Sequence, residues 1–263
     1  MIMINWLLRK KFIRRRLLFQ IQQNYFHELL ISIPINSGYQ AHLLEIDSYD
    51  SFSEIFINQE YSNFLPKEPI SRILDIGAHY GYFSLWFHSV NNSKHIHSLM
   101  IEASPRCKRS LEFLISQEQF IDKFTYIQGA ISSPNSKSTK FYDRSHMGGS
   151  SYPQSNSEVE INVPSLSEEE LIEASNQHFD LIKCDIEGSE WEFLCHYSKI
   201  ISSAKYILLE WHSWHSGGGG YNQIIWKLKG YNYQILKASK PSKAIGRDGE
   251  IGLILARNNS HKN

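Results

Sequence analysis

Short apolar segments alternate with amphipathic segments along the chain after Pro69. Each apolar segment is followed by polar or glycine-containing residues, which is the pattern of buried strands that end in turns. Strands are predicted at 73–76, 95–102, 124–131, 179–185, 205–211, about 231–237 and about 250–256. Helices are predicted at 81–90, 104–117, a short segment from Ser167, 189–197 and 221–229.

This alternation of strands and helices predicts an α/β fold with a mostly parallel sheet covered by helices on both faces. The link at 239–249 has the composition of a turn, so the last two strands are expected to be antiparallel. Ligands of such sheets bind beyond the carboxyl ends of the strands. Functional residues are therefore expected just after each strand.

The region before Pro69 does not follow this alternation. Residues 4–31 have helical periodicity, and short extended segments are predicted at about 41–47 and 53–58. Prolines at 66 and 69 then mark a boundary. We therefore predict an N-terminal appendage, residues 1–64, followed by the main domain, residues 65–263.

An insertion is predicted at residues 132–165, which are rich in Ser, Asn, Pro and Gly. Two extended pieces, 139–143 and 158–163, favour an irregular insertion or a hairpin above the site. The segment is expected to form part of a substrate lid, and a plain flexible loop is the alternative.

The composition is that of an ordinary globular protein, with 263 residues, 41% hydrophobic and 21% charged. Basic and acidic residues number 27 each, which excludes a globally basic nucleic-acid-binding protein and an acidic disordered tail. The charge is uneven, because residues 1–30 hold six basic residues and one acid, leaving −5 on the remainder. This basic start could contact a membrane surface or a second subunit, or form a solvated helix packed on the domain.

The three cysteines, Cys107, Cys184 and Cys195, are odd in number and lack the spacing of a metal knuckle. Reduced thiols in a cytoplasmic protein are expected. No apolar stretch approaches the roughly 18 residues of a membrane span, and the charges at 9–16 do not precede an apolar run as in a signal peptide.

The first chemical motif is Asp75-Ile-Gly-Ala-His-Tyr-Gly-Tyr-Phe83, which follows a predicted strand and opens a helix. Gly77 and Gly81 permit a sharp turn and close approach of a ligand. The spacing is not the G-x-G-x-x-G of nicotinamide dehydrogenases, and a carboxylate at this turn would repel a pyrophosphate. Asp75 instead suits a ligand with a positive group, such as S-adenosylmethionine. A generic strand–turn–helix corner is the alternative.

The second motif is Glu102, at the end of the next strand and 21 residues after Gly81. An acid at about this spacing accepts hydrogen bonds from ribose hydroxyls. A surface acid at a strand end is the alternative interpretation.

Acidic residues also follow the fourth and fifth strands. Alternation places Lys183, Asp185 and Glu187 on one side of the extended chain, and Glu190 favours the start of a helix. Glu210 and His212 end the neighbouring strand. Carboxylates and an imidazole could bind a divalent cation, form a general base with its orienting partner, or be a structural polar network.

The segments DIGAHYGYFSL, MIEASP, IQGAIS, FDLIKCDIEGSEWEFL and ILLEWH resemble the FkbM family of S-adenosylmethionine-dependent methyltransferases over about residues 70–257. The resemblance implies a seven-stranded Rossmann-like class I methyltransferase sheet, order 3-2-1-4-5-7-6, with the seventh strand antiparallel. It implies cofactor contacts from Asp75, Gly77, Ala78, His79, Gly81, Phe83, Glu102, Ala103, Gly129, Ala130 and Asp185. His79 replaces a frequent Asn, and GAIS lacks an acid that many class I enzymes place there.

The resemblance implies O-methylation of a hydroxyl on a glycan, polyketide or other secondary metabolite. Candidate bases are Asp185, Glu187 and His212, with Lys183 or a divalent cation stabilising the alkoxide. Asp185, Glu210 and His212 are the candidate ligands of that cation. The net charge of −5 on the body argues against a nucleic-acid acceptor. A membrane-surface or partner-binding module on a methyltransferase-like scaffold is the alternative function.

Overall fold

The computed structural model describes residues 30–261 except 46, 92–94, 133–135, 145–148, 154–158, 176–177, 215–218 and 244–247. The basic segment 1–29, on which the helix and membrane-contact predictions fall, lies outside the described residues. In the described part of the chain, no helix has the length and apolar character needed to cross a membrane.

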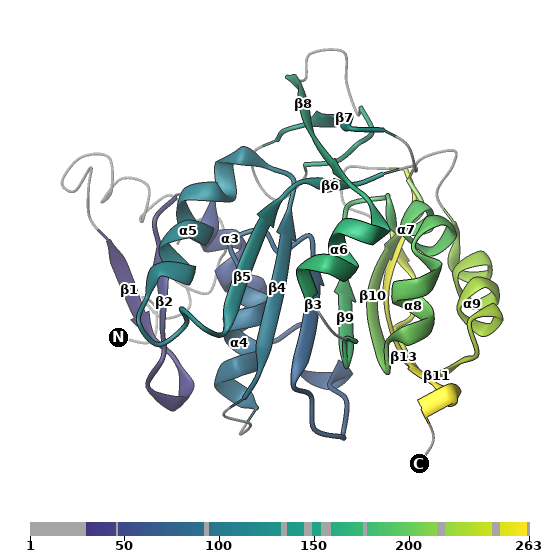
Figure 1. Cartoon of the computed structure of the whole chain (residues 1–263), viewed down its shortest axis with the longest axis horizontal. Helices are drawn as coiled ribbons and strands as arrows, with labels where there is room; N and C mark the ends of the chain where they lie inside the picture. Colours follow the sequence, from purple (N-terminus) through teal and green to yellow (C-terminus); the bar gives the residue numbers. More distant parts are fainter. Residues whose placement is uncertain are drawn as a thin grey trace, which may run out of the picture.

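One twisted sheet forms the centre of the fold (Figure 1). Its strands run in the order β5-β4-β3-β9-β10-β13-β11, which is 3-2-1-4-5-7-6 in chain order. Strand β13 is antiparallel to both of its neighbours, and a short strand, β12, pairs with it. The predicted sheet is confirmed. The strands are β3 (Arg72–Ile76), β4 (His97–Glu102), β5 (Phe124–Gln128), β9 (Leu181–Cys184), β10 (Tyr206–His212), β11 (Tyr233–Ala238), β12 (Ser242–Lys243) and β13 (Glu250–Asn258).

Alternation along each strand builds one hydrophobic core on each face of the sheet. Ile73 and Leu181 point to the face covered by α4 and α5, whereas Leu74 and Ile182 point to the face covered by α6, α7, α8 and α9. This two-faced arrangement matches the predicted layers. The helices are α4 (Tyr82–Val90), α5 (Lys108–Ser116), α6 (Glu168–Ser175), α7 (Glu190–His196), α8 (Ser198–Ser203) and α9 (Tyr221–Gly230).

The segment before β3 packs into the core on the α4 face, through residues such as Leu43 and Phe52. The extended segment predicted at 53–58 is wrong, because the chain is helical there. Phe52 and Ile55 are buried three residues apart, which is a helical period rather than a strand period. The elements are β1 (Ile31–Pro34), η1 (Asn36–Gly38), β2 (Gln40–Leu43), α3 (Ser48–Phe52), η2 (Ser53–Ile57) and η3 (Ser62–Phe64).

The insertion forms a hairpin, which is one of the two alternatives that the sequence favours. Strands β7 (Ser138–Tyr142) and β8 (Glu160–Leu166) are antiparallel, and β8 also pairs with β6 (Ala130–Ile131). Gly129 separates β6 from β5, so the third predicted strand is divided in two. The hairpin stands above the carboxyl ends of β3, β4 and β9 (Figure 1).

Candidate active site

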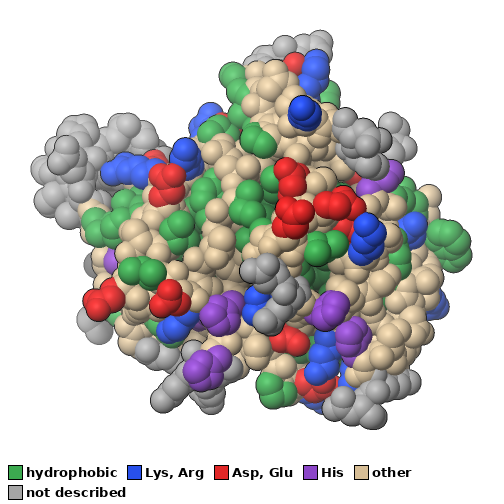
Figure 2. Space-filling view, viewed as in Figure 1, with side chains coloured by type: hydrophobic (Ala, Val, Ile, Leu, Met, Phe, Trp, Pro, Cys, Tyr) green, Lys and Arg blue, Asp and Glu red, His purple; other side chains and the backbone are tan. Residues whose placement is uncertain are grey.

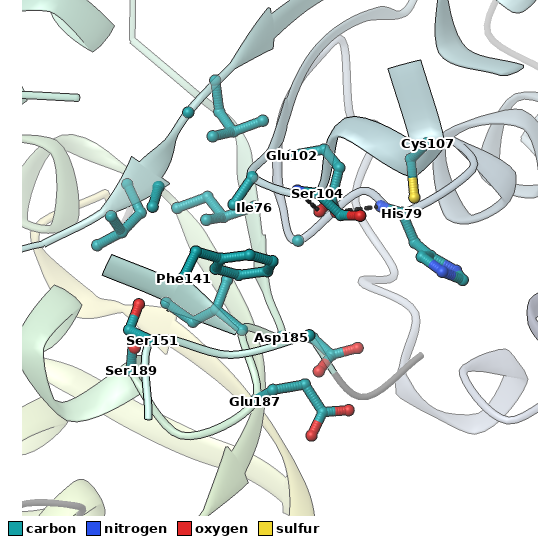
Figure 3. Close-up of a pocket in the computed structure, with 18 of the residues that line it drawn as sticks. Ile76, His79, Glu102, Ser104, Cys107, Phe141, Ser151, Asp185, Glu187 and Ser189 are labelled. Atoms are coloured by element: carbon teal, nitrogen blue, oxygen red, sulfur yellow. Dashed lines mark hydrogen bonds between the residues drawn. The ribbon is translucent and has the colours of Figure 1, made fainter. Parts of the chain in front are cut away.

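A pocket opens at the carboxyl ends of β3, β4 and β9, beneath the hairpin (Figure 3). Its walls include the predicted cofactor residues Gly77, His79, Glu102, Ala103, Gly129, Ala130 and Asp185, and the catalytic candidate Glu187.

The two glycines of the first motif have different roles. Gly77 has φ +74°, and a Cβ there would overlap the carbonyl oxygen of Asp185. The turns after β3 and β9 therefore meet at Gly77, which requires the absence of a side chain. Gly81 has φ +77° and precedes α4, and a Cβ there would press on Leu114 of α5. Gly81 shapes the turn without lining the pocket.

Asp75 lies beneath the pocket and is not on its wall. Strand alternation turns its side chain toward α4, where Ser84 Oγ donates a hydrogen bond of 2.7 Å to Oδ2. Asp75 is fully buried and does not line the pocket, so its contact with the cofactor stays a prediction. Ala78 and Phe83 are also absent from the pocket wall among the described residues.

Lys183 pairs in register with Asp75 on the neighbouring strand, which brings the two side chains together on the α4 face. Its Nζ is 3.6 Å from Asp75 and 3.5 Å from Asp185, and donates a 2.9 Å hydrogen bond to the Gly77 carbonyl. Burial favours the neutral amine, but the charges of Asp185 and Asp75 outweigh it and raise the pKa of Lys183. Lys183 therefore ties the turn after β3 to the turn after β9.

Glu102 reaches the pocket with both oxygens already fixed by the backbone. Oε2 accepts the His79 N–H at 2.7 Å, and Oε1 accepts the Ser104 N–H at 2.7 Å. Each carboxylate oxygen can accept a second hydrogen bond, so the group remains able to bind ribose hydroxyls. Burial, followed by the charge of Lys183, lowers the pKa of His79 to about 3, so its imidazole is neutral.

A second polar group lies beside the pocket, where β9 and β10 end. Tyr61 donates a hydrogen bond of 2.8 Å to Glu210 Oε2, and its hydroxyl is 3.4 Å from Asp185 Oδ2. The Tyr61 ring packs on Phe83 of α4, with centroids 5.2 Å apart. Burial and the nearby Asp185 charge raise the pKa of Glu210. Sequence reasoning missed Tyr61, which precedes the predicted main domain and carries no motif.

Glu190 and His212 form a buried pair within this group. Glu190 Oε1 accepts the backbone N–H groups of Ile186 and Gly188, at 3.0 and 3.1 Å, and lies 2.8 Å from His212 Nδ1. The opposing burial effect is outweighed by the Glu190 charge, which raises the pKa of His212 to about 10. Glu190 therefore does more than begin α7, since it also orients the imidazole.

Hydrogen bonds connect the hairpin to the sheet domain at two places beside the pocket. Asp143 accepts hydrogen bonds from Ser104 Oγ at 2.6 Å and Arg106 Nε at 2.7 Å, next to Glu102. Tyr152 donates a 2.7 Å hydrogen bond to Glu192 on α7. Between these points, the hairpin lines the pocket with Phe141, Arg144, Gly149 and Ser151. No motif marks these contacts in the sequence.

Comparison with known proteins finds a match to one protein family. Residues 75–235 match the family described as "Methyltransferase FkbM domain", whereas no curated protein matches. The putative transferase PH0793 of Pyrococcus horikoshii is a similar solved structure, with 12% identity, TM-score 0.52, and coverage of 92% of this chain and 82% of that one. It shares the fold.

Two further similar structures are fibrillarin of Aeropyrum pernix, with bound S-adenosyl-L-methionine, and magnesium protoporphyrin IX methyltransferase of Synechocystis. The first has 13% identity and TM-score 0.44, covering 73% of this chain and 68% of that one. The second has 9% identity and TM-score 0.44, covering 81% of each chain. On the family match over residues 75–235, the chain belongs to the FkbM family of S-adenosylmethionine-dependent methyltransferases.

Proposed function

We propose that the protein transfers the methyl group of S-adenosylmethionine to a hydroxyl oxygen of a glycan, polyketide or other secondary metabolite. The observation that supports this most strongly is the position of Asp185 and Glu187, which lie next to each other on the pocket wall (Figure 3). A hydroxyl is a weak nucleophile, and a carboxylate within hydrogen-bond reach removes its proton as the new bond forms. An acceptor hydroxyl beside these carboxylates would therefore be activated.

The residues on the pocket wall fit the cofactor. Glu102 suits the ribose hydroxyls, and Gly77, Gly129 and Ala130 leave room for close approach to the backbone. The acidic residues on the wall, Glu102, Asp185 and Glu187 among them, suit a ligand with a net positive charge. When bound, S-adenosylmethionine supplies an electrophilic methyl group on a sulfonium, and this chain has to position the acceptor in line with it.

The four catalytic candidates take different roles in this proposal. Asp185 and Glu187 line the pocket and are placed to take the proton. Lys183 is held by three oxygens beneath the pocket, so it positions Asp185 and Gly77 and does not reach the acceptor. His212 does not line the pocket, and its Nδ1 contacts Glu190, so we propose that it acts through the neighbouring carboxylates.

The charge of the surface is consistent with a neutral acceptor. On the face shown in Figure 2, the described Lys and Arg side chains are scattered among acidic ones and do not gather into one patch. A nucleic-acid substrate requires a basic track for its phosphates.

The proposal is tested by incubating the protein with methyl-labelled cofactor and a panel of acceptors that carry hydroxyl, amine or carboxylate groups. We expect label only on hydroxyl compounds. Asp185→Asn should still bind S-adenosylhomocysteine in a calorimetric titration and should lose most turnover. Transfer to nitrogen or a carboxylate would contradict the proposal, and full activity of Asp185→Asn would remove Asp185 from the mechanism.

A further inference from the structure

The polar group beside the pocket combines carboxylates and an imidazole at close range. Ligand atoms of Asp185, Glu190 and His212 all lie within 4.8 Å of one another. Glu210 lies next to His212, with its Oε1 3.9 Å from His212 Nε2. Oxygen and imidazole ligands together suit divalent cations such as Mn²⁺.

His212 is presented as a metal-binding histidine is. A ligating imidazole usually donates its other ring N–H to a carboxylate, which fixes the ring. Here Nδ1 is 2.8 Å from Glu190, on a side chain that is only 3% exposed. The remaining nitrogen, Nε2, has no hydrogen bond to another described residue, and it faces Glu210 at a distance too long for one.

Glu190 is the orienting residue rather than a ligand, because its oxygens already accept two backbone N–H groups in addition to the imidazole. Asp185 and Glu210 are better candidates for ligands than Glu190. Their side chains are 24% and 15% exposed, which leaves an approach for an ion. Tyr61 fixes Oε2 of Glu210 and leaves Oε1 directed at the imidazole.

The distances fit a shared ion. Ligands about 2.1 Å from a cation lie about 3–4 Å from one another, according to the coordination angle. The 3.9 Å separation of Glu210 Oε1 and His212 Nε2 falls in this range. Ligand atoms of Asp185 and His212 lie within 4.8 Å of each other, so Asp185 would move toward a bound ion.

The charges around the site favour a cation. In the part of the cluster that the structure describes, the carboxylates of Asp75, Asp185, Glu190 and Glu210 are paired with two basic groups, Lys183 and His212. Burial makes an uncompensated carboxylate costly. The single charge of the methyl donor would balance only part of the excess.

We propose that Asp185, Glu210 and His212 Nε2 bind one divalent cation of the Mn²⁺ type, with Glu190 as the residue that orients His212. Binding through Nε2 releases its proton to solvent. Asp185 belongs to both the ion site and the pocket wall, so a bound ion would supply positive charge close to the acceptor site. That role rests on the proposed function. The acceptor hydroxyl would give its proton to Glu187, and its oxygen would take the methyl group from the sulfonium of S-adenosylmethionine, which would leave as S-adenosylhomocysteine.

The test measures Mn²⁺ binding to the 263-residue protein through the loss of the electron paramagnetic resonance signal of the free ion. Binding of S-adenosylhomocysteine is measured in parallel by calorimetry. We expect one bound Mn²⁺ per chain and at least tenfold weaker binding in Glu210→Gln and in Asp185→Asn. Glu192→Gln is the matched control, because Glu192 follows Glu190 by two residues on α7 but accepts a hydrogen bond from Tyr152, outside the cluster. Its Mn²⁺ affinity should equal that of the natural protein.

Absence of Mn²⁺ binding at millimolar concentration, in protein that binds S-adenosylhomocysteine, would overturn the ion site and leave the methyltransferase proposal intact. Equal Mn²⁺ affinity in all three variants would also overturn it, because the ion would then bind elsewhere. Circular dichroism establishes that each variant is folded. Mn²⁺ bound as predicted, together with label transferred to nitrogen acceptors, would retain the ion site and contradict the proposed acceptor.

Discussion

The two sides of the pocket are built in different ways. The side formed by β3 and β4 consists of a glycine turn and one acid, Glu102, whose oxygens are set by backbone N–H groups. On the opposite side, the end of β9 places Asp185 and Glu187 on the wall. Side chains from distant segments, including Tyr61 and His212, lie behind Asp185 without lining the pocket, and together with it they form the β9–β10 side. A ligand bound at the first side meets mostly fixed backbone, whereas one bound at the second meets residues that depend on one another.

This difference predicts which substitutions affect which step. Changes on the β3–β4 side should weaken binding of the cofactor or its product, S-adenosylhomocysteine. Changes on the β9–β10 side should alter turnover while leaving that affinity nearly unchanged.

The largest effect is expected from Gly77→Ala, because Gly77 joins both sides. The new methyl group would overlap the Asp185 carbonyl, at a backbone φ that alanine rarely adopts. We expect unfolding to become easier by more than about 2 kcal/mol, with loss of measurable S-adenosylhomocysteine binding in calorimetry. The control is Gly230→Ala, where a Cβ meets nothing within 4 Å. Near-normal binding in Gly77→Ala would show that the two turns can separate.

The next effect is expected from Glu102→Gln, which alters the β3–β4 side alone. Loss of a charged acceptor for the ribose costs roughly 1.5–3 kcal/mol, or about 10- to 100-fold in affinity. Calorimetry with S-adenosylhomocysteine measures this directly. Glu112→Gln, an exposed carboxylate on α5 paired with Lys108, is the control and should bind normally.

Tyr61→Phe should affect the β9–β10 side alone. Without the hydroxyl, Glu210 loses its hydrogen bond and Asp185 loses a neighbour. We expect turnover to fall about tenfold, with unchanged S-adenosylhomocysteine affinity, measured on the acceptor that the labelled-cofactor screen identifies. The control is Tyr82→Phe, whose hydroxyl donates to the His42 carbonyl away from the carboxylates. Equal losses in both variants would mean that Tyr61 serves stability alone.

The smallest effect is expected from Asp143→Asn, which weakens the contacts of the hairpin with Ser104 and Arg106. Arg106 is half exposed, so its ion pair with Asp143 contributes little in water. We expect S-adenosylhomocysteine to dissociate about two- to fivefold faster in stopped-flow measurements. Asp122→Asn, in an exposed turn before β5, should leave the rate unchanged. A larger change in affinity at equilibrium than in dissociation rate would indicate that Asp143 acts on the pocket itself.

The contrast between the two sides also explains what the sequence could predict. Strand order and the two cores follow from local patterns, as at Ile73 and Leu74, because alternation assigns each residue to a face. Glu102 was predictable for the same reason, since its distance from Gly81 is set by one strand–helix–strand unit.

The β9–β10 side was only partly predictable. Strand ends identified Asp185, Glu210 and His212, but the partners Tyr61 and Glu190 come from contacts over 149 and 22 residues of sequence. Asp75 shows that a motif alone does not fix where a side chain lies. Its position in the motif suits a cofactor contact, but it does not line the pocket, because strand alternation turns its side chain toward Ser84.

A crystal structure with bound S-adenosylhomocysteine tests the central claim most directly, because it locates both ends of the cofactor product. The ribose hydroxyls should lie within hydrogen-bond distance of Glu102, and the sulfur should face Asp185 and Glu187. A ribose away from Glu102, or a sulfur directed at the hairpin instead of the two carboxylates, would contradict the division of the pocket into a cofactor side and an acceptor side.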